Sequence, residues 1–199
     1  MNKMRINSKR LLPVAFLYCC ACGGREALEV PVRVEGVAFD QAAQAPVIFL
    51  HEEKGERRLP IWIGLAEAQA IAMKLEGITP PRPQTHDLLK AVLDRTGAEV
   101  KKVVVTELRE GVYYARIHLS VGRGTVEVDS RPSDAIALAL RSGSPIFVAR
   151  PVFEASKDSA PPPGSGPDLR AEANGTLRLS QWLEWAGWSR KLLQPVLLA

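Results

Sequence analysis

Four polar residues that can do chemistry are crowded into one short stretch of the sequence. They are Asp129, Arg131, Ser133 and Asp134, and they lie where an alternating apolar run ends and an alanine-rich run begins behind Pro132. The pattern predicts a strand followed at once by the N-terminus of a helix. Such a junction offers free backbone N–H groups and the positive end of the helix dipole. It suits an anionic ligand, and the planar guanidinium of Arg131 suits two-point contact with a phosphate.

The elements around this junction follow a regular order. Strand patterns cover residues 30–39, 46–50, 58–63, 100–108, 112–119 and 125–129, and helical patterns cover residues 65–75, 86–96 and 132–141. The helix at 65–75 is apolar on nearly all sides, which predicts burial on more than one face. The helix at 86–96 is amphipathic, and its apolar stripe is formed by Leu88, Leu89, Val92 and Leu93.

An internal repeat relates the two halves of the body. Ala-Ile-Ala-Met at 70–73 matches Ala-Ile-Ala-Leu at 135–138, at an offset of 65 residues. Each half reads as three strands and an alanine-rich helix. We therefore expect an α/β domain of the α+β class over residues 29–155, in which duplicated β(3)-α repeats form β/α/β layers. The two small-residue helices are expected side by side between two sheets, with the amphipathic helix between the repeats.

The same offset predicts that the charged junction exists in one half only. The first half has Gly64, Ala66 and Gln69 where the second half has Asp129, Arg131 and Asp134. The repeat therefore favours one composite site over two equivalent sites.

The excess positive charge lies at the N-terminus. The formal net charge is +4, and the four basic residues within the first ten account for it. The remaining body is neutral overall, so attraction to nucleic-acid phosphates requires a local patch. The body also contains no cysteine, which excludes a disulfide framework and a cysteine-based zinc site there.

Both ends of the chain differ from the body. Residues 1–21 have the layout of an export signal, and Cys22 resembles the lipidated residue of a bacterial lipoprotein, with residues 22–28 as a tether. We expect a lipid-anchored protein of the cell envelope that faces the periplasm or the exterior; simple secretion and an uncleaved anchor are the alternatives. Residues 156–176 form a Pro/Gly/Ser linker. Residues 177–199 are rich in tryptophan, which predicts a helix docked on the domain or a second subunit, or one at a membrane interface.

Three sequence blocks resemble the bifunctional nuclease domain family. They are LPIWIGLAEAQAIAMKLEG (59–77), PRPQTHDLL (81–89) and DSRPSDAIALALRSGSPIFV (129–148), in the family's order. The resemblance implies a duplicated α/β fold, a homodimer, and nuclease activity on RNA and DNA, with RNA or single-stranded DNA as the partner nucleic acid. The proline-rich linker and the tryptophan-rich tail depart from the plant members, which continue into a helical hairpin module.

The resemblance also implies a metal-assisted site. Nucleases commonly hold Mg²⁺ or Mn²⁺ with two or three carboxylates near the scissile phosphate. The acids at motif positions give Glu67, Asp129 and Asp134 as expected metal ligands. His86 and Asp87 are further catalytic candidates, and His86 suits a general base or a metal ligand.

The expected substrate-binding residues are Arg131, Arg82 and Ser133. Ser133 lacks a surrounding G-x-S-x-G elbow, which favours a hydrogen bond in the first helical turn over a nucleophilic role. Either arginine could instead serve as the structural partner of Glu67, because a carboxylate in a buried helix needs one.

The other candidates have structural alternatives too. Asp87 and Asp134 stand in first helical turns, where a carboxylate is favourable by about 0.3 to 1 kcal/mol without any function. Asp129 could accept backbone N–H bonds or pair with Arg131, and His86 could be an exposed first-turn residue. The sequence leaves two functions open: a metal-dependent nuclease, and a non-catalytic envelope protein that binds a partner or an anionic ligand at the same junction.

Overall fold

The computed structural model describes residues 28–41 and 43–158. The strands are β1 (Glu29–Asp40), β2 (Ala45–Glu52), β3 (Arg58–Trp62), β4 (Ala98–Arg109), β5 (Val112–Val121), β6 (Gly124–Ser130) and β7 (Ile146–Ala149). The helices are α1 (Leu65–Leu75), α2 (Thr85–Thr96), α3 (Pro132–Ser142) and α4 (Arg150–Asp158). The export signal, the lipidation residue Cys22 and the tryptophan-rich segment lie outside the described residues, as do most of the tether and of the linker.

The strands form one sheet in the order β3-β2-β1-β7-β4-β5-β6. Each half of the repeat contributes an antiparallel meander, β1 to β3 and β4 to β6. The short strand β7 joins them, because it pairs antiparallel with β1 and parallel with β4. The α+β class and the duplicated order of elements are confirmed. The expectation of two separate sheets is wrong, since β7 pairs with both meanders.

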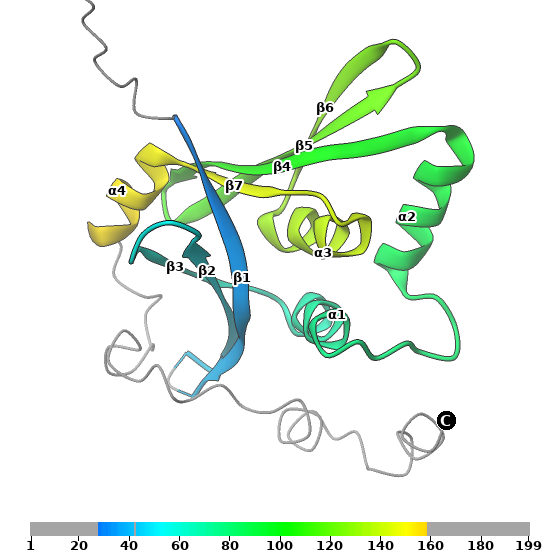
Figure 1. Cartoon of the computed structure of the whole chain (residues 1–199). Helices are drawn as coiled ribbons and strands as arrows, with labels where there is room; N and C mark the ends of the chain where they lie inside the picture. The colour runs from blue at the N-terminus through cyan, green and yellow to red at the C-terminus, as the bar shows by residue number, and fades with distance from the viewer. Residues whose placement is uncertain (1–27, 42, 159–199) are drawn as a thin grey trace, which may run out of the picture.

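The two alanine-rich helices pack against each other between the two strand groups (Figure 1). Helix α1 also packs on β1 and β2, and α3 packs on β4 and β5, so each helix covers the meander of its own repeat. The small side chains allow this close packing. Five consecutive residues of α3, 135–139, are at most 1% exposed, and α1 buries Ala68 and Ile71 completely. The predicted burial of α1 is confirmed for its middle, while Leu65 and Leu75 at its ends are exposed.

Helix α2 exposes much of its apolar stripe. Leu93 packs against the core, but Leu88, Leu89 and Val92 are 60%, 39% and 49% exposed. The residue of α2 that is buried is His86, at 7% exposure. The expectation of an exposed first-turn histidine is therefore wrong, because the first turn of α2 faces α3.

The C-terminal part of the domain adds two elements that the sequence pattern did not reveal, β7 and α4. Val152 and Phe153 of α4 are buried in the core. Helix α4 continues to Asp158, so it extends three residues past the boundary expected for the linker. No helix within 28–41 and 43–158 is long and apolar enough to cross a membrane.

Candidate functional site

Helices α1, α2 and α3 each carry an acid at the third position of the helix. These acids are Glu67, Asp87 and Asp134. The residues that precede the three helices have extended backbones. A carboxylate in this position is stabilised by the first-turn N–H groups and by the helix dipole. Two arginines also bind these acids: Arg131 binds Glu67 and Asp134, and Arg141 binds Asp87.

Arg131 connects the acids of α1 and α3. Its Nε donates to Oδ2 of Asp134 at 2.6 Å, and its Nη2 donates to Oδ1 of Asp134 at 3.0 Å and to Oε1 of Glu67 at 2.7 Å. The two carboxylates hold the pKa of Arg131 above its ordinary value, through hydrogen bonds to Asp134 and then to Glu67. The side chain is nevertheless 65% exposed, and Nη1 makes no hydrogen bond within the described chain. One edge of the guanidinium thus faces solvent.

His86 brings α2 to the same carboxylate. Its Nε2 lies 3.1 Å from Oδ1 of Asp134, and the two side chains are 10% and 28% exposed. Burial alone would raise the pKa of Asp134, but the hydrogen bonds from Arg131 and His86 outweigh it and lower the pKa below its ordinary value. Asp134 therefore stays ionised between a guanidinium and an imidazole.

Asp87 belongs to a second, more deeply buried contact. Arg141, near the end of α3, donates from Nε to Oδ1 of Asp87 at 2.5 Å, and the N–H of Gln84 donates to Oδ2 at 2.9 Å. Burial would raise the pKa of Asp87, but these hydrogen bonds, from Gln84 and then from Arg141, lower it. Sequence reasoning missed Arg141. The available signal was a single basic residue in the last turn of an otherwise apolar helix.

The helix starts revise the internal repeat. Gly64 and Arg131 both precede the first residue of a repeat helix, and Glu67 and Asp134 both stand three residues later. The prediction that Asp134 has no counterpart in the first half is therefore wrong, because the helix starts are 67 residues apart and not 65. The carboxylate is duplicated and the guanidinium is not. A Cβ atom at Gly64 would lie 2.3 Å from Oε2 of Glu67, so the glycine leaves space for this carboxylate.

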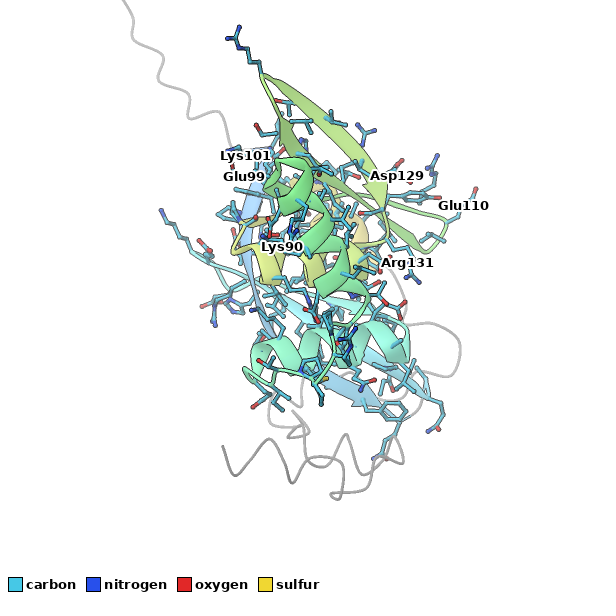
Figure 2. The ribbon with its side chains drawn as sticks, turned by 90° about the vertical axis from the view of Figure 1, so that its right-hand side faces the viewer. Lys90, Glu99, Lys101, Glu110, Asp129 and Arg131 are labelled. Carbon is cyan, nitrogen blue, oxygen red and sulfur yellow. The ribbon has the colours of Figure 1, made fainter. Side chains whose placement is uncertain are left out.

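Besides Asp87, three of the predicted site residues make no described side-chain contact with Glu67, His86, Arg131 or Asp134. Asp129 lies on β6 opposite Arg116 in the neighbouring strand, and Figure 2 shows it above Arg131, which directly precedes α3. Arg82 is exposed in the connection between α1 and α2. Ser133 is 5% exposed in the first turn of α3. The structure thus brings together Glu67, His86, Arg131 and Asp134, which we call the Arg131 cluster.

The expected metal ligands do not form a ready cation site. Glu67 and Asp134 are near each other, but the guanidinium of Arg131 binds both carboxylates, and Asp129 is not in contact with them. Among residues 28–41 and 43–158, no group of three or more His, Cys, Asp or Glu side chains is arranged to hold a metal ion. The set of Glu67, Asp129 and Asp134 therefore does not fit Mg²⁺ or Mn²⁺ in this conformation.

Comparisons with known proteins identify the family. The sequence model of the bifunctional nuclease domain matches residues 48–160, more than half of the chain. An uncharacterized protein of Mycobacterium tuberculosis is 44% identical over 122 residues, which cover 61% of this chain and 73% of that protein. Bifunctional nuclease 1 of Arabidopsis thaliana is 32% identical over 154 residues, 71% of this chain and 47% of that protein. Bifunctional nuclease 1 of Oryza sativa subsp. japonica is 32% identical over 114 residues, 56% of this chain and 34% of that protein. The chain therefore belongs to the bifunctional nuclease domain family.

Proposed function

We propose that this protein is a nuclease that hydrolyses phosphodiester bonds of RNA or single-stranded DNA at the Arg131 cluster. The observation that carries the proposal is the placement of Arg131. Its exposed guanidinium is held by Glu67 and Asp134, beside the first turns of two helices, in a domain of the bifunctional nuclease family. The names of the plant relatives point to the same class of substrate.

In this proposal Arg131 contacts the scissile phosphate. The Nη1 group faces solvent and can donate to one phosphate oxygen, while a second oxygen can be bound only where a carboxylate leaves Nη2; the helix N-termini add positive potential. A phosphate on Arg131 competes with the carboxylates for the same guanidinium. Binding of the substrate therefore loosens Glu67 and Asp134 at the moment when a base is needed.

The freed carboxylates supply the acid–base chemistry. Hydrolysis adds water across the P–O bond, so the attacking water must lose a proton and the leaving sugar oxygen must gain one. Asp134 with His86 at 3.1 Å forms a pair that can take and return this proton, and Glu67 is the second carboxylate within reach of Arg131. The family resemblance also implies that cleavage depends on Mg²⁺ or Mn²⁺. The acid–base roles proposed for Asp134, His86 and Glu67 do not depend on this metal.

The test is cleavage of labelled RNA and single-stranded DNA by the purified full chain, with Mg²⁺, with Mn²⁺ and with chelator. We expect Glu67→Gln and Asp134→Asn to reduce cleavage by about 10²-fold or more. Asp94→Asn, an exposed acid on α2, is the matched control and keeps full activity. Equal cleavage by all variants would reject the site, and no cleavage by the wild type would reject the activity. If the wild type cleaves with Mg²⁺ or Mn²⁺ and loses cleavage only in chelator, the activity requires a metal ion.

A second candidate function is binding without catalysis at the cell envelope. It is favoured by the mutual pairing of Arg131, Glu67 and Asp134, which is sufficient as a structural link between helices. In this case Arg131→Ala lowers the melting temperature and changes no nucleic-acid property. A defect in cleavage at unchanged melting temperature would reject this second candidate.

A further inference from the structure

Strand β5 carries an aromatic residue next to the start of the Arg131 side chain. The last pair between β5 and β6 is Ala115 with Ser130. Arg131 follows Ser130 with an extended backbone, and Tyr114 precedes Ala115, so the next position of the same register sets Tyr114 opposite Arg131. Residues directly opposite each other share a face of the sheet. The two side chains therefore begin at neighbouring points on one face.

Only the second half of the repeat combines a tyrosine and an arginine at this place. In the first half, the N–H of Ile63 donates to the carbonyl oxygen of Pro46 at 2.9 Å. The next position of that strand pair sets Ala45 opposite Gly64, which precedes α1 as Arg131 precedes α3. The first half thus forms the same strand-to-helix junction with a methyl group and a hydrogen atom. The junction does not need the ring and the guanidinium for folding, which favours a functional role for the pair.

The ring of Tyr114 lies on the face of β5 opposite to the core. The hydroxyl of its neighbour Tyr113 donates to the carbonyl oxygen of Pro60 at 3.5 Å, and its other neighbour, Ala115, is fully buried. Side chains alternate along a strand, so Tyr114 points the other way. Tyr114 is partly exposed, and its hydroxyl makes no hydrogen bond within the described residues. The guanidinium of Arg109 lies 4.6 Å from the ring centre.

We propose that Tyr114 is the stacking platform for the unpaired base next to the phosphate on Arg131. The inference rests on the proposed function, because it extends the same site from the phosphate to the base. Every nucleic-acid base has a π face, and stacking on an aromatic side chain holds single strands without reading their sequence. A base inside a duplex is already stacked and paired, so the platform selects a single-stranded substrate.

The contact with Arg109 marks a ring face that can accept a planar partner. The side chain of Arg109 is 56% exposed, and its ion pair with Glu107 is long, at 3.5 Å. A stacked base is worth more than an exposed cation–π contact, so the base can take the place of this guanidinium on the ring.

The charge around the platform suits a base better than a phosphate. Figure 2 shows Glu110 and Asp129 on the same side of the view as Arg131. Carboxylates repel a phosphate and do not repel a neutral base. The phosphate is therefore directed to Arg131, and the base to Tyr114.

Binding of a single strand with and without its bases tests the platform. The probes are a single-stranded DNA hexamer with phosphorothioate linkages, which resist hydrolysis, and the same backbone with an abasic sugar at every position. We expect the full wild-type chain to bind the intact strand about tenfold or more tighter than the abasic strand, by fluorescence anisotropy in Mg²⁺. Tyr114→Ala removes this difference by weakening only the binding of the intact strand. Tyr114→Phe restores it, because the ring and not the hydroxyl holds the base.

Phe49 provides the matched control. Arg58 lies 4.6 Å from its ring centre, as Arg109 does from that of Tyr114, but β2 belongs to the other meander. Phe49→Leu therefore keeps the wild-type difference between the two probes. On RNA, Tyr114→Ala should raise KM about tenfold and leave kcat nearly unchanged, since the stack is lost equally from the ground state and the transition state. Melting temperatures verify folding of each variant.

The outcomes separate the platform from the nuclease activity. An unchanged base dependence in Tyr114→Ala would overturn the platform, as would a wild type that binds both probes equally or binds neither. Base dependence that requires Tyr114, in a protein that cleaves no strand, would support the platform and reject the cleavage alone. Cleavage that is indifferent to Tyr114→Ala would reject the platform and leave the nuclease proposal in place.

Discussion

Arg141 and Asp87 form a contact that joins the end of α3 to the first turn of α2, with Nε 2.5 Å from Oδ1. The same guanidinium donates to the carbonyl oxygens of Ala137 in α3 and Ala70 in α1. Its side chain is only 6% exposed. One buried cation thus ties together the three helices that carry the Arg131 cluster.

We predict that Arg141→Leu lowers the free energy of unfolding by about 1.5–3 kcal/mol, the usual worth of a hydrogen bond to a charged group. Asp87→Asn acts in the same direction, because it leaves the buried guanidinium without its carboxylate. Urea unfolding of both single variants and the double variant measures the coupling. If the loss of unfolding free energy in the double variant equals the sum of the losses in the two single variants, the two residues do not act as a pair.

The proposed role of Arg131 predicts that the charge and the shape of its side chain have separable effects on cleavage. We expect Arg131→Ala to lose about 10²-fold or more of the cleavage rate, and Arg131→Lys to recover a part of it, since lysine keeps the charge and loses the two-point contact. Initial rates on RNA and single-stranded DNA give the comparison. The melting temperature of both variants should change little, because an exposed ion pair contributes at most about 1 kcal/mol. Equal rates for Ala and Lys would refute a role for the charge.

Gly64→Ala is expected to displace the carboxylate of Glu67. The new Cβ would lie 2.3 Å from Oε2, and the backbone of Gly64 is extended, so alanine causes no backbone strain. Cleavage should fall toward the level of Glu67→Gln. In a Glu67→Ala background the same change should have no effect on cleavage, because the displaced group is missing. A large effect in that background would mean that Gly64 acts by another route.

Asp134 should make stability depend on pH. Its pKa is below the ordinary value of 3.8 in the folded state, so on acidification the unfolded chain binds the proton first. The stabilisation is present above the ordinary pKa and is lost as pH falls through the folded one. From about pH 5 downward, the free energy of unfolding should fall more steeply in the wild type than in Asp134→Asn. Denaturant unfolding between pH 7 and 3 measures both slopes. Asp94→Asn should keep the steep slope, and a wild-type slope equal to that of Asp134→Asn would contradict the assignment.

The expected location at the cell envelope depends on the prediction that Cys22 is lipidated. We predict that radiolabelled palmitate labels the wild type in bacteria and does not label Cys22→Ser. Cys19→Ser is the control and should keep its label. Equal labelling of the wild type and Cys22→Ser would refute the anchor.

The local elements were predictable and the global pairing was not. Alternating patterns located β1 to β6, and the alanine-rich runs located α1 and α3, because periodicity reports which faces are buried. The four residues of β7 are too few to show a period, yet they decide that the sheet is single. The apolar stripe on α2 was visible in the sequence, but periodicity does not tell a face that packs inside one chain from a face that is left exposed.

The site was predictable by region and only in part by partner. The sequence offered Arg131 as a partner of Glu67, which the structure confirms, but it did not predict the contacts of Asp134 with Arg131 and His86. Sequence reasoning selected Glu67, His86, Arg131 and Asp134, which the fold brings together. It also selected Asp129, which is near in sequence but lies on β6 opposite Arg116 and makes no described contact with the Arg131 cluster. The repeat was aligned on identical alanines, and those are selected for helix packing. The positions of the helix starts, which decide which acids correspond, could be read only from the backbone.

Strand β7 also sets the order in which the domain can be completed. Until residues 146–149 are in place, β1 and β4 each lack a neighbour on the side that faces the other half. A ribosome-bound chain that ends before Ile146 therefore holds two meanders with four open edges in total. Its assembly into one sheet waits for a segment near the C-terminal end of the domain. During that interval the open edges can pair with strands of other chains.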